Sequence, residues 1–431
     1  MPAFAKLKGR LRVPGDKSIT HRALVFSVLA RGTCTLIGPS PAEDCRSTMR
    51  CLERLGLHIE MGPDNAGEAL TIRTSGLSGL SPPEGTLYAG NSGTTIRLLS
   101  GVLAGRPFAA TLDGDRSLRA RPMARVLDPL RQMGARVEYM DRQGCAPFSI
   151  TGGSLTGISF DCPVASAQVQ TALLLAGLQA EGQTTVRLPG RVRDHTTRMF
   201  LYLGVPHTSD EAGTVTVSRL AEPVPPFATA IPGDISSAAF FLVAAALLPG
   251  SHVVLENCGI NPGRTLVLDV LARMGADVTL ENVRQLAGEP VADISIRYGG
   301  RLAGTTIAEA EIASGIDEIP ILALAGALSK GIFSVRGASE LRVKESDRLS
   351  AIVSNLRGIG AIVTEHADGF EVEGQERLRG GAFWRTFADH RLAMMGLVAR
   401  QVCREPIEMD DIECVRISYP SFQDDLQSLL S

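Results

Sequence analysis

The sequence predicts an α/β protein of two domains, each built from three copies of one repeated unit. Six segments of the chain pair a small polar cluster with an apolar, helix-like run, and the clusters recur about 68 to 83 residues apart. This period exceeds the roughly 20 to 50 residues of solenoid repeats and fits a small subdomain. A chain of 431 residues also exceeds one typical hydrophobic core. Six copies therefore divide into two domains of three.

Each copy opens with a polar cluster at the expected start of a helix. The clusters are DKSITHR from Asp16, GNSGTTIR from Gly90, ASAQVQ from Ala165, GDISS from Gly233, GIDEIP from Gly315 and ADHR from Ala388. The first turn of a helix has unpaired N–H groups and the positive end of the helix dipole, which suits an anion. Six such helix starts indicate an anionic substrate.

Three kinds of element follow these clusters. Helices that are apolar on all sides, and so are expected to be buried on all sides, lie at residues 23–30, 97–105, 169–178, 238–248, 321–328 and 392–399. Amphipathic helices, with one solvent-exposed face, are expected at residues 47–56, 125–134, 266–275 and 350–360. Strands that end in turn-forming residues are expected at residues 33–38, 108–114, 184–190, 252–258, 332–337 and 406–411. We expect the apolar helices inside, with the sheets and amphipathic helices outside.

The domain boundary is expected in the Pro-rich stretch 221–233, which has little periodicity. The sixth copy ends without its last strand, and the N-terminal stretch KLKGRLRVPG is expected to supply it. We therefore expect residues 16–230 to form one domain, inserted into a discontinuous domain of residues 1–15 and 231–431.

The composition excludes several classes of protein. A net charge of −3 argues against nucleic-acid binding, which needs a basic field. The longest apolar run, residues 238–248, is too short to span a bilayer, and we expect neither a leader segment nor membrane attachment. The eight cysteines form no CxxC pair and no cluster with histidine, which predicts reduced thiols in a cytoplasmic protein, without a disulfide or metal site.

Three motifs of the N-terminal half indicate anion binding. Lys17, Ser18 and Arg22 place two cations at a helix start, although a solvated helix capped by Ser18 fits equally well. Gly93 allows backbone N–H groups to approach a ligand closely, whereas an ordinary glycine turn is the alternative. Four arginines follow within ten residues, and they form either a solvated basic face or a bidentate site for a phosphate or carboxylate: Arg116, Arg119, Arg121 and Arg125.

The segment RVKESDRL is the densest charge cluster of the chain. Lys344 and Arg348 are four residues apart, so they are expected to share a helix face as a clamp for one anion. Glu345 beside them would be a poised acid. The alternative is a solvated helix start, as for most charge runs.

Two further helix starts carry candidate catalytic groups. Asp317 begins an otherwise apolar helix, where it either caps the helix or accepts a proton from a substrate hydroxyl. His390 and Arg391 lie at the start of the last apolar helix; the histidine alone would more commonly be structural, and the adjacent arginine favours a functional role.

The motifs PGDKSITHR, AGNSGTTIRLLSG, DGDRSLRARPM, GDISSAAFFL, RVKESDRL and ADHRLAMM, in this order along the whole chain, resemble the 5-enolpyruvylshikimate-3-phosphate synthase family of enolpyruvyl transferases. The resemblance implies an inside-out α/β barrel of six βαβαββ units in two half-domains that close on substrate. It also implies a monomeric enzyme of the shikimate pathway of aromatic amino-acid biosynthesis. No metal or organic cofactor is implied.

The resemblance also implies substrates and residue roles. The enzyme would transfer the enolpyruvyl group of phosphoenolpyruvate to the 5-hydroxyl of shikimate 3-phosphate, and glyphosate would inhibit it. The residues implied at shikimate 3-phosphate are Lys17, Ser18, Arg22, Ser166, Ala167, Gln168, Arg193, Asp317 and Lys344. Those implied at phosphoenolpyruvate are Lys17, Asn91, Gly93, Arg121, Arg348 and Arg391.

Two positions depart from the family pattern. Ala167 stands where the family often has a second serine, which leaves a backbone contact or none. Ile417 stands where one branch has a lysine near the chain end, with Arg416 beside it.

The implied chemistry is an addition followed by an elimination. Glu345, aided by Lys17, would protonate C3 of phosphoenolpyruvate, while Asp317 takes the proton of the 5-hydroxyl; His390 is the remaining catalytic candidate. The tetrahedral ketal phosphate would then lose phosphate.

Two alternatives remain from the sequence. The sister transferase that acts on UDP-N-acetylglucosamine usually carries a reactive cysteine before the arginine cluster, and no cysteine lies between Leu112 and Pro122. A non-catalytic repeat protein that binds an anion would keep the basic residues but would have no need for Asp317 and Glu345.

Overall fold

In a computed structural model of the chain, residues 6–64, 67–190, 192–210 and 213–431 are described. Residues 1–5 of the predicted N-terminal segment 1–15 therefore lie outside the described residues. The chain divides into two compact units. Unit 1 comprises Met1–Pro14, Pro232–Gln285 and Pro290–Ser431, and unit 2 comprises Gly15–Ile231 and Leu286–Glu289. None of the helices in the described ranges has the length and apolar character needed to cross a bilayer.

Unit 2 contains three buried helices, and each begins at one of the polar clusters. These are α1 (Lys17–Phe26), α3 (Gly93–Leu103) and α6 (Ala167–Gly177). The side chains of Asp16, Ser92 and Ser166 accept hydrogen bonds from backbone N–H groups of the first turn, which would otherwise be unpaired. The remaining helices of unit 2 are α2 (Glu43–Arg54), α4 (Arg116–Arg119), α5 (Ala124–Gln132) and α7 (His195–Leu203).

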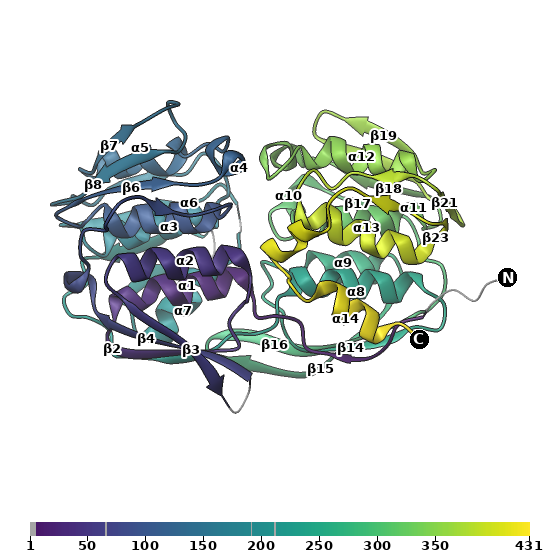
Figure 1. The fold of residues 1–431 in the computed structure, drawn as a ribbon, viewed down its shortest axis with the longest axis horizontal. Coiled ribbons are helices and arrows are strands. Elements are labelled where there is room, and N and C mark those ends of the chain that lie inside the picture. Colours follow the sequence, from purple (N-terminus) through teal and green to yellow (C-terminus); the bar gives the residue numbers. More distant parts are fainter. Residues whose placement is uncertain (1–5, 65–66, 191, 211–212) are drawn as a thin grey trace. The chain divides into compact units, whose positions relative to one another are not determined.

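Three four-stranded sheets of one topology surround these helices (Figure 1). A short strand pairs in parallel with the strand that follows a buried helix, and the other two strands are antiparallel. In sheet order, the strands are β13 (Ala228–Ala230), β2 (Arg31–Ile37), β4 (Gly67–Ser75) and β3 (His58–Asp64); β5 (Leu87–Tyr88), β6 (Ala109–Asp113), β8 (Phe148–Thr151) and β7 (Arg136–Tyr139); and β9 (Ser159–Asp161), β10 (Gln183–Arg187), β12 (Val215–Ser218) and β11 (His207–Ser209).

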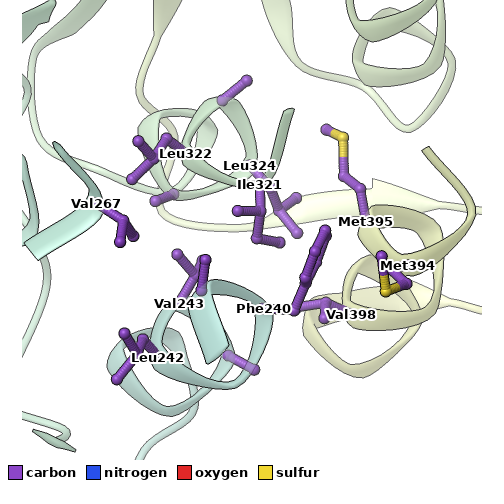
Figure 2. Packing of buried hydrophobic residues seen from close by; sticks show 14 of the residues in the cluster. Phe240, Leu242, Val243, Val267, Ile321, Leu322, Leu324, Met394, Met395 and Val398 are labelled. Atoms are coloured by element: carbon purple, nitrogen blue, oxygen red, sulfur yellow. The ribbon is translucent and has the colours of Figure 1, made fainter. Parts of the chain in front are cut away.

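Unit 1 is built on the same plan. Its buried helices α8 (Ile235–Leu247), α11 (Ile319–Ala327) and α13 (His390–Val402) pack against one another. Figure 2 shows Phe240 of α8, Leu324 of α11 and Met395 of α13 in their shared core. Because these helices are apolar all round, they can lie only where other elements cover them. The outer and short helices are α9 (Leu266–Arg273), α10 (Glu309–Ile312), α12 (Arg348–Gly358) and α14 (Phe422–Leu429).

Two sheets of unit 1 have the same four-stranded topology as the sheets of unit 2, and the remaining sheets have two strands each. In sheet order, the strands are β1 (Lys8–Leu11), β14 (His252–Gly259), β16 (Glu289–Arg297) and β15 (Asp277–Leu286), then β17 (Thr306–Ile307), β18 (Ile332–Val335), β20 (Gly369–Glu373) and β19 (Ile362–His366). The strands on either side of α13 form two-stranded sheets, β21 (Leu378–Gly380) with β23 (Cys403–Glu405) and β22 (Phe383–Trp384) with β24 (Glu408–Met409).

Two expectations from the sequence need correction. Each sheet in the described residues is open, so the expected barrel is not closed by strand pairing. The N-terminal strand β1 does not complete the sixth copy: it pairs in parallel with β14, and a single bridge, Leu7 to Leu430, joins its neighbour to the chain end. The sheet of β14 has the open parallel edge that β1 fills, because no preceding strand of its own copy occupies it.

Candidate active site

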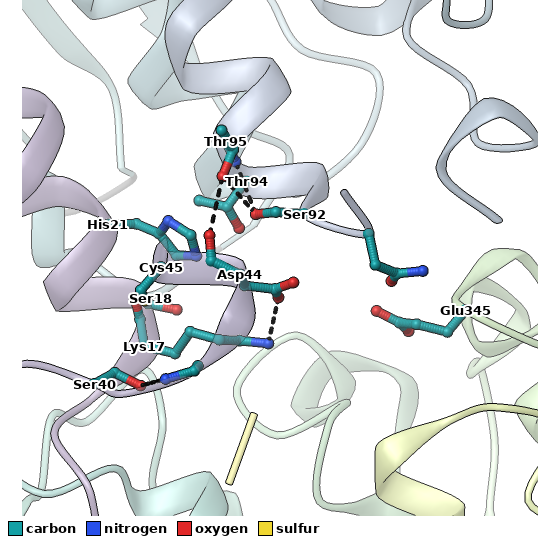
Figure 3. Close-up of polar contacts among 12 residues, drawn as sticks. Lys17, Ser18, His21, Ser40, Asp44, Cys45, Ser92, Thr94, Thr95 and Glu345 are labelled. Atoms are coloured by element: carbon teal, nitrogen blue, oxygen red, sulfur yellow. Dashed lines mark hydrogen bonds and ion pairs between the residues drawn. The ribbon is translucent and has the colours of Figure 1, made fainter. Parts of the chain in front are cut away.

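In unit 2, the start of α1 carries Lys17 and Ser18. The Lys17 ammonium contacts Asp44 of α2, with 2.8 Å between Nζ and Oδ2 (Figure 3). Arg193 donates a hydrogen bond to the Ser18 hydroxyl at 3.1 Å. Asp16, rather than Ser18, caps the helix, because its Oδ1 accepts from the Ile19 N–H at 2.9 Å. The alternative in which Ser18 is the cap is therefore wrong.

Arg22, also on α1, is buried within unit 2. It is 1% exposed, and its Nε donates to the Thr196 hydroxyl at 2.8 Å. The same guanidinium donates to Thr171 and to the Ser18 carbonyl oxygen. Arg22 thus ties α1 to α6 and α7, and it fixes the backbone at Ser18.

His21 is the second buried titratable group of α1. Its Nδ1 lies 2.7 Å from the Thr48 hydroxyl, and the ring is 1% exposed. Burial, together with the charges of Lys17 and Arg22, lowers the pKa of His21 well below its ordinary value. A neutral ring therefore lies beneath the cationic helix start.

Asn91 is held between two charged side chains at the start of α3. Its amide donates to Asp115 at 2.7 Å, and Arg121 donates to its side-chain oxygen at 2.7 Å. Gly93 follows as the first residue of α3, and a Cβ atom there would lie 2.8 Å from Nη1 of Arg97 and 3.4 Å from Nη1 of Arg121. Two guanidinium groups therefore approach the backbone where only glycine leaves room.

The start of α6 is coupled to the start of α3 by a polar chain. Arg97 donates to the Gln168 side-chain oxygen at 2.6 Å, and the Gln168 amide donates to the Thr94 hydroxyl at 2.9 Å. Ser166 caps α6 through the Val169 N–H, and Ala167 is the first helical residue. The hydroxyl of Ser166 is thus already used at the helix start.

In unit 1, Arg348 is the centre of an ion-pair network. Its guanidinium, 1% exposed, lies 2.7 Å from Asp389, 2.7 Å from Glu345 and 3.2 Å from Asp317. Burial alone would lower the pKa of Arg348, but the carboxylates of Asp389 and Glu345 outweigh it and raise the pKa above its usual value. A charged arginine therefore gathers three carboxyl groups from three helix starts.

Two interpretations of this region are wrong. Lys344 and Arg348 do not share a helix face, because Lys344 is extended and α12 begins only at Arg348; instead, both approach Asp317, at 3.8 and 3.2 Å. Asp317 does not cap α11, whose N-cap residue is Glu318. The Asp317 carboxylate faces cations instead of backbone N–H groups.

Arg391 is the second residue of α13 and is buried in unit 1. It is 5% exposed, its Nη1 donates to the backbone oxygen of Ser236 at 3.1 Å, and its Nε has no hydrogen-bond partner. The neighbouring His390 is 2% exposed. Within the described part of the chain, Arg391 forms no direct ion pair with a carboxylate, although the buried Glu318 carboxyl is near enough for the two charges to interact.

Sequence reasoning missed several partners of these residues. Asp44 lies in the amphipathic helix α2, and no motif in the sequence marks it as the partner of Lys17. Asp389 was visible in the motif ADHR, but its role as the partner of Arg348 depends on packing. Arg264 is buried and donates to Asp234 and Ser236, far from it in the sequence.

Ile417 is the second position that departs from the family pattern, and its neighbour in the sequence is a solvent-exposed arginine. Arg416, next to Ile417, is exposed and pairs with Glu413 at 3.1 Å. No group of three potential metal ligands among His, Cys, Asp and Glu occurs within the described residues.

Comparisons with known proteins agree along the whole chain. The family model for EPSP synthase (3-phosphoshikimate 1-carboxyvinyltransferase) matches residues 2–426. A 3-phosphoshikimate 1-carboxyvinyltransferase of Alkaliphilus metalliredigens is 45% identical over 99% of this chain and 98% of its own, and one of Synechococcus sp. is 48% identical over 99% and 95%.

Solved structures give the same result. An EPSP synthase from Acinetobacter baumannii superposes with a TM-score of 0.88 at 41% identity, covering 100% of this chain and 97% of that one. The enolpyruvyl transferase NikO from Streptomyces tendae, at 18% identity and a TM-score of 0.80 over 100% and 96%, shares the fold. The mixed α/β fold, the helix-start clusters and the full-length similarity together show that this chain belongs to the EPSP synthase (3-phosphoshikimate 1-carboxyvinyltransferase) family.

Proposed function

We propose that the helix-start clusters of the two units carry out the reaction for which the family is named. The enzyme transfers the enolpyruvyl group of phosphoenolpyruvate to the 5-hydroxyl of shikimate 3-phosphate and releases phosphate. The observation that carries this proposal is the ion-pair network of unit 1, in which Arg348 holds Asp317 and Glu345 at helix starts. An addition of a hydroxyl to the double bond of an enol phosphate needs one proton donor and one proton acceptor, and two carboxyl groups on one fixed cation meet that need.

Unit 2 supplies binding groups for the phosphates. Lys17, Ser18 and Arg193 lie together at the start of α1 and bind shikimate 3-phosphate, with Arg22 and Gln168 behind them. The phosphate of phosphoenolpyruvate binds at the start of α3, where Asn91 and Arg121 lie and where Gly93, without a side chain, lets guanidinium groups approach the backbone. Ser166 and Ala167 contribute backbone at the start of α6.

Unit 1 supplies the carboxylate-binding and proton-transfer groups. Arg348 and Arg391 bind the carboxylate of phosphoenolpyruvate, and Lys344 binds shikimate 3-phosphate. Asp317 accepts the proton of the 5-hydroxyl, and Glu345, aided by Lys17, donates a proton to C3. His390 is the remaining catalytic candidate of unit 1. Elimination of phosphate from the tetrahedral ketal then gives the enolpyruvyl ether.

Four finer features belong to the same proposal. Glyphosate competes with phosphoenolpyruvate, because it carries a phosphonate and a carboxylate that the same arginines can bind. The chain acts as a monomer in the cytoplasm, in keeping with its free buried cysteines. Five sheets of one strand order support a six-repeat, inside-out fold, whose sixth copy contains α13 and two small sheets instead of a four-stranded one. The two compact units serve as its two domains.

The decisive experiment measures phosphate release from phosphoenolpyruvate with shikimate 3-phosphate or UDP-N-acetylglucosamine as acceptor. Turnover with shikimate 3-phosphate alone is expected. Asp317→Asn and Glu345→Gln should lower kcat by roughly 10²–10⁴, as for the loss of a positioned acid or base. Glu376→Gln, which neutralises an exposed carboxylate of the same unit, is the control and should keep wild-type kcat. Binding of phosphoenolpyruvate without phosphate release would show a non-catalytic anion-binding protein.

A further inference from the structure

Glu318 carries a buried carboxyl group that neither the helix starts nor the proposed reaction uses. The residue is 1% exposed and is the N-cap residue of α11, yet its side chain makes no capping hydrogen bond. Both carboxyl oxygens are shielded from solvent and make no hydrogen bond of full geometry, although the Ser236 hydroxyl is close enough to act on them. A buried carboxyl in this state is costly to keep ionised.

The local sequence removes one of the two backbone donors that this carboxyl could cap. A capping oxygen accepts from the second or third N–H of the helix, and the second residue of α11 is Pro320, which has no N–H. The carboxylates of Asp234, Asp347 and Asp389, by contrast, all cap their helices. At α11 the cap interaction is weakened, and the longer side chain of Glu318 lies in the interior.

The three charged groups and the one hydroxyl that act on the Glu318 carboxyl come from four places in the unit. Asp317 precedes it on the same segment, Arg264 lies before α9, Arg391 lies on α13, and Ser236 lies on α8. Burial raises the pKa of Glu318 most, and the Asp317 charge adds to this, while Arg264, Arg391 and the Ser236 hydroxyl act in the opposite direction. Because its pKa is raised, the Glu318 carboxyl accepts a proton more readily than an ordinary glutamate.

A charge count shows when that proton would be taken up. Five cationic side chains lie in the described helix-start clusters of unit 1, namely Arg264, Arg342, Lys344, Arg348 and Arg391. Six carboxyl groups lie with them, namely Asp234, Asp317, Glu318, Glu345, Asp347 and Asp389. When all are ionised, the carboxylates outnumber the cations before any anionic substrate arrives. A bound anion would add to that excess unless one carboxyl becomes neutral.

We propose that Glu318 is a positioning residue that takes up one proton from solvent when an anionic substrate binds at Arg391. In the free enzyme, the ionised carboxylate balances Arg264 and Arg391 and holds them in place. In the complex, the substrate carboxylate replaces that charge, and Glu318 is neutral. The proposal rests on the proposed function, because it takes phosphoenolpyruvate as the anion.

The first test counts protons taken up during binding. Phosphoenolpyruvate is titrated into the enzyme without a second substrate, by calorimetry in two buffers of different ionisation enthalpy at neutral pH. Wild-type enzyme should take up more protons per site than Glu318→Gln, an isosteric uncharged variant, by a substantial fraction of one proton. Glu376→Gln is the matched control and should behave as wild type. Equal uptake by wild type and Glu318→Gln would overturn the proposal.

The second test uses the pH dependence of KM for phosphoenolpyruvate. If binding requires protonation of Glu318, the wild-type KM rises with pH relative to that of Glu318→Gln, by up to tenfold per pH unit. A merely structural role would change KM by the same factor at every pH. If the variant fails to fold, difference infrared spectra of the wild-type enzyme decide, because the protonated carboxyl band should appear when phosphoenolpyruvate is added, and its absence would overturn the proposal. Phosphate release by wild type, measured in parallel, tests the proposed function separately.

Discussion

A methyl group at position 93 would meet two guanidinium groups before it met any ligand. A Cβ atom there would lie 2.8 Å from Nη1 of Arg97, so that arginine must move, and the move displaces a flexible side-chain end instead of backbone. Arg97 in turn holds Gln168. The geometry at Gly93 therefore sets the space and the charge available to a phosphate or phosphonate.

Gly93→Ala should weaken glyphosate more than phosphoenolpyruvate. Glyphosate is the longer molecule, so a crowded phosphate-binding end should exclude it first. We expect the inhibition constant to rise at least about tenfold more than KM for phosphoenolpyruvate, a difference of about 1.4 kcal/mol. Gly153→Ala, where a Cβ atom meets nothing within 4 Å, is the control. An equal change in both constants would show that position 93 does not discriminate between the two ligands.

His21 should make stability sensitive to acid. Since its pKa is lowered in the folded state, the unfolded chain binds the proton more tightly, and protonation favours unfolding. Its stabilising contribution is complete above the ordinary pKa of about 6.5 and is lost as the pH falls toward the folded value. Relative to His21→Asn, the wild-type free energy of unfolding should decrease by about 1.4 kcal/mol per pH unit below 6.5. Parallel pH profiles in urea denaturation would contradict this.

At the scale of elements, the helix starts combine capping with ion pairing. Asp389 accepts from the Arg391 N–H at 2.9 Å and also pairs with Arg348, while it is itself fully buried. Asp347 also caps α12, through the Ser350 N–H, but its side chain is exposed and pairs with the partly buried Arg342. The two caps therefore differ in burial, and Asp389 accepts from the second N–H of its helix whereas Asp347 accepts from the third.

Asp389→Ala should be far more costly than Asp347→Ala. Removing one partner of a buried ion pair costs about 3–5 kcal/mol, whereas losing an exposed cap costs about 1 kcal/mol. Asp389→Asn keeps an oxygen that can cap α13 and should lie between the two alanine variants. The free energies of unfolding in urea test this order, and equal losses for the two alanine variants would refute the role of the Arg348 pair.

At the scale of the whole molecule, all eight cysteines are free and buried. Burial raises the pKa of Cys51 to about 12 and also raises the pKa of Cys45 well above its usual value. The thiolate is the reactive form, so these thiols should be inert in the folded protein. An aromatic disulfide reagent should label the native protein slowly and all eight thiols after denaturation. Rapid labelling of a thiol in the native protein would contradict this prediction, because it would show that the core opens and exposes a buried cysteine.

Local chemistry accounts for the parts of the fold that could be predicted from the chain. The starts of α1, α3 and α6 fall at the polar clusters because Asp and Ser caps act within three residues, and all-apolar runs mark buried helices wherever they occur. The order of the motifs along the chain was enough to identify the family resemblance, which the full-length comparisons confirm.

Long-range pairing accounts for what the tertiary structure alone decided. Lys17 meets Asp44, and Arg348 meets Asp389, because packed helices bring their starts together, and no spacing rule connects residues 41 apart. The strand β1 joins β14 because that sheet has an open parallel edge. Glu318 lies in the interior, where Arg264 and Arg391 act on its charge, and Pro320 leaves it one capping donor instead of two. Periodicity and capping act over a few residues, whereas partner choice depends on which surfaces the completed fold brings into contact.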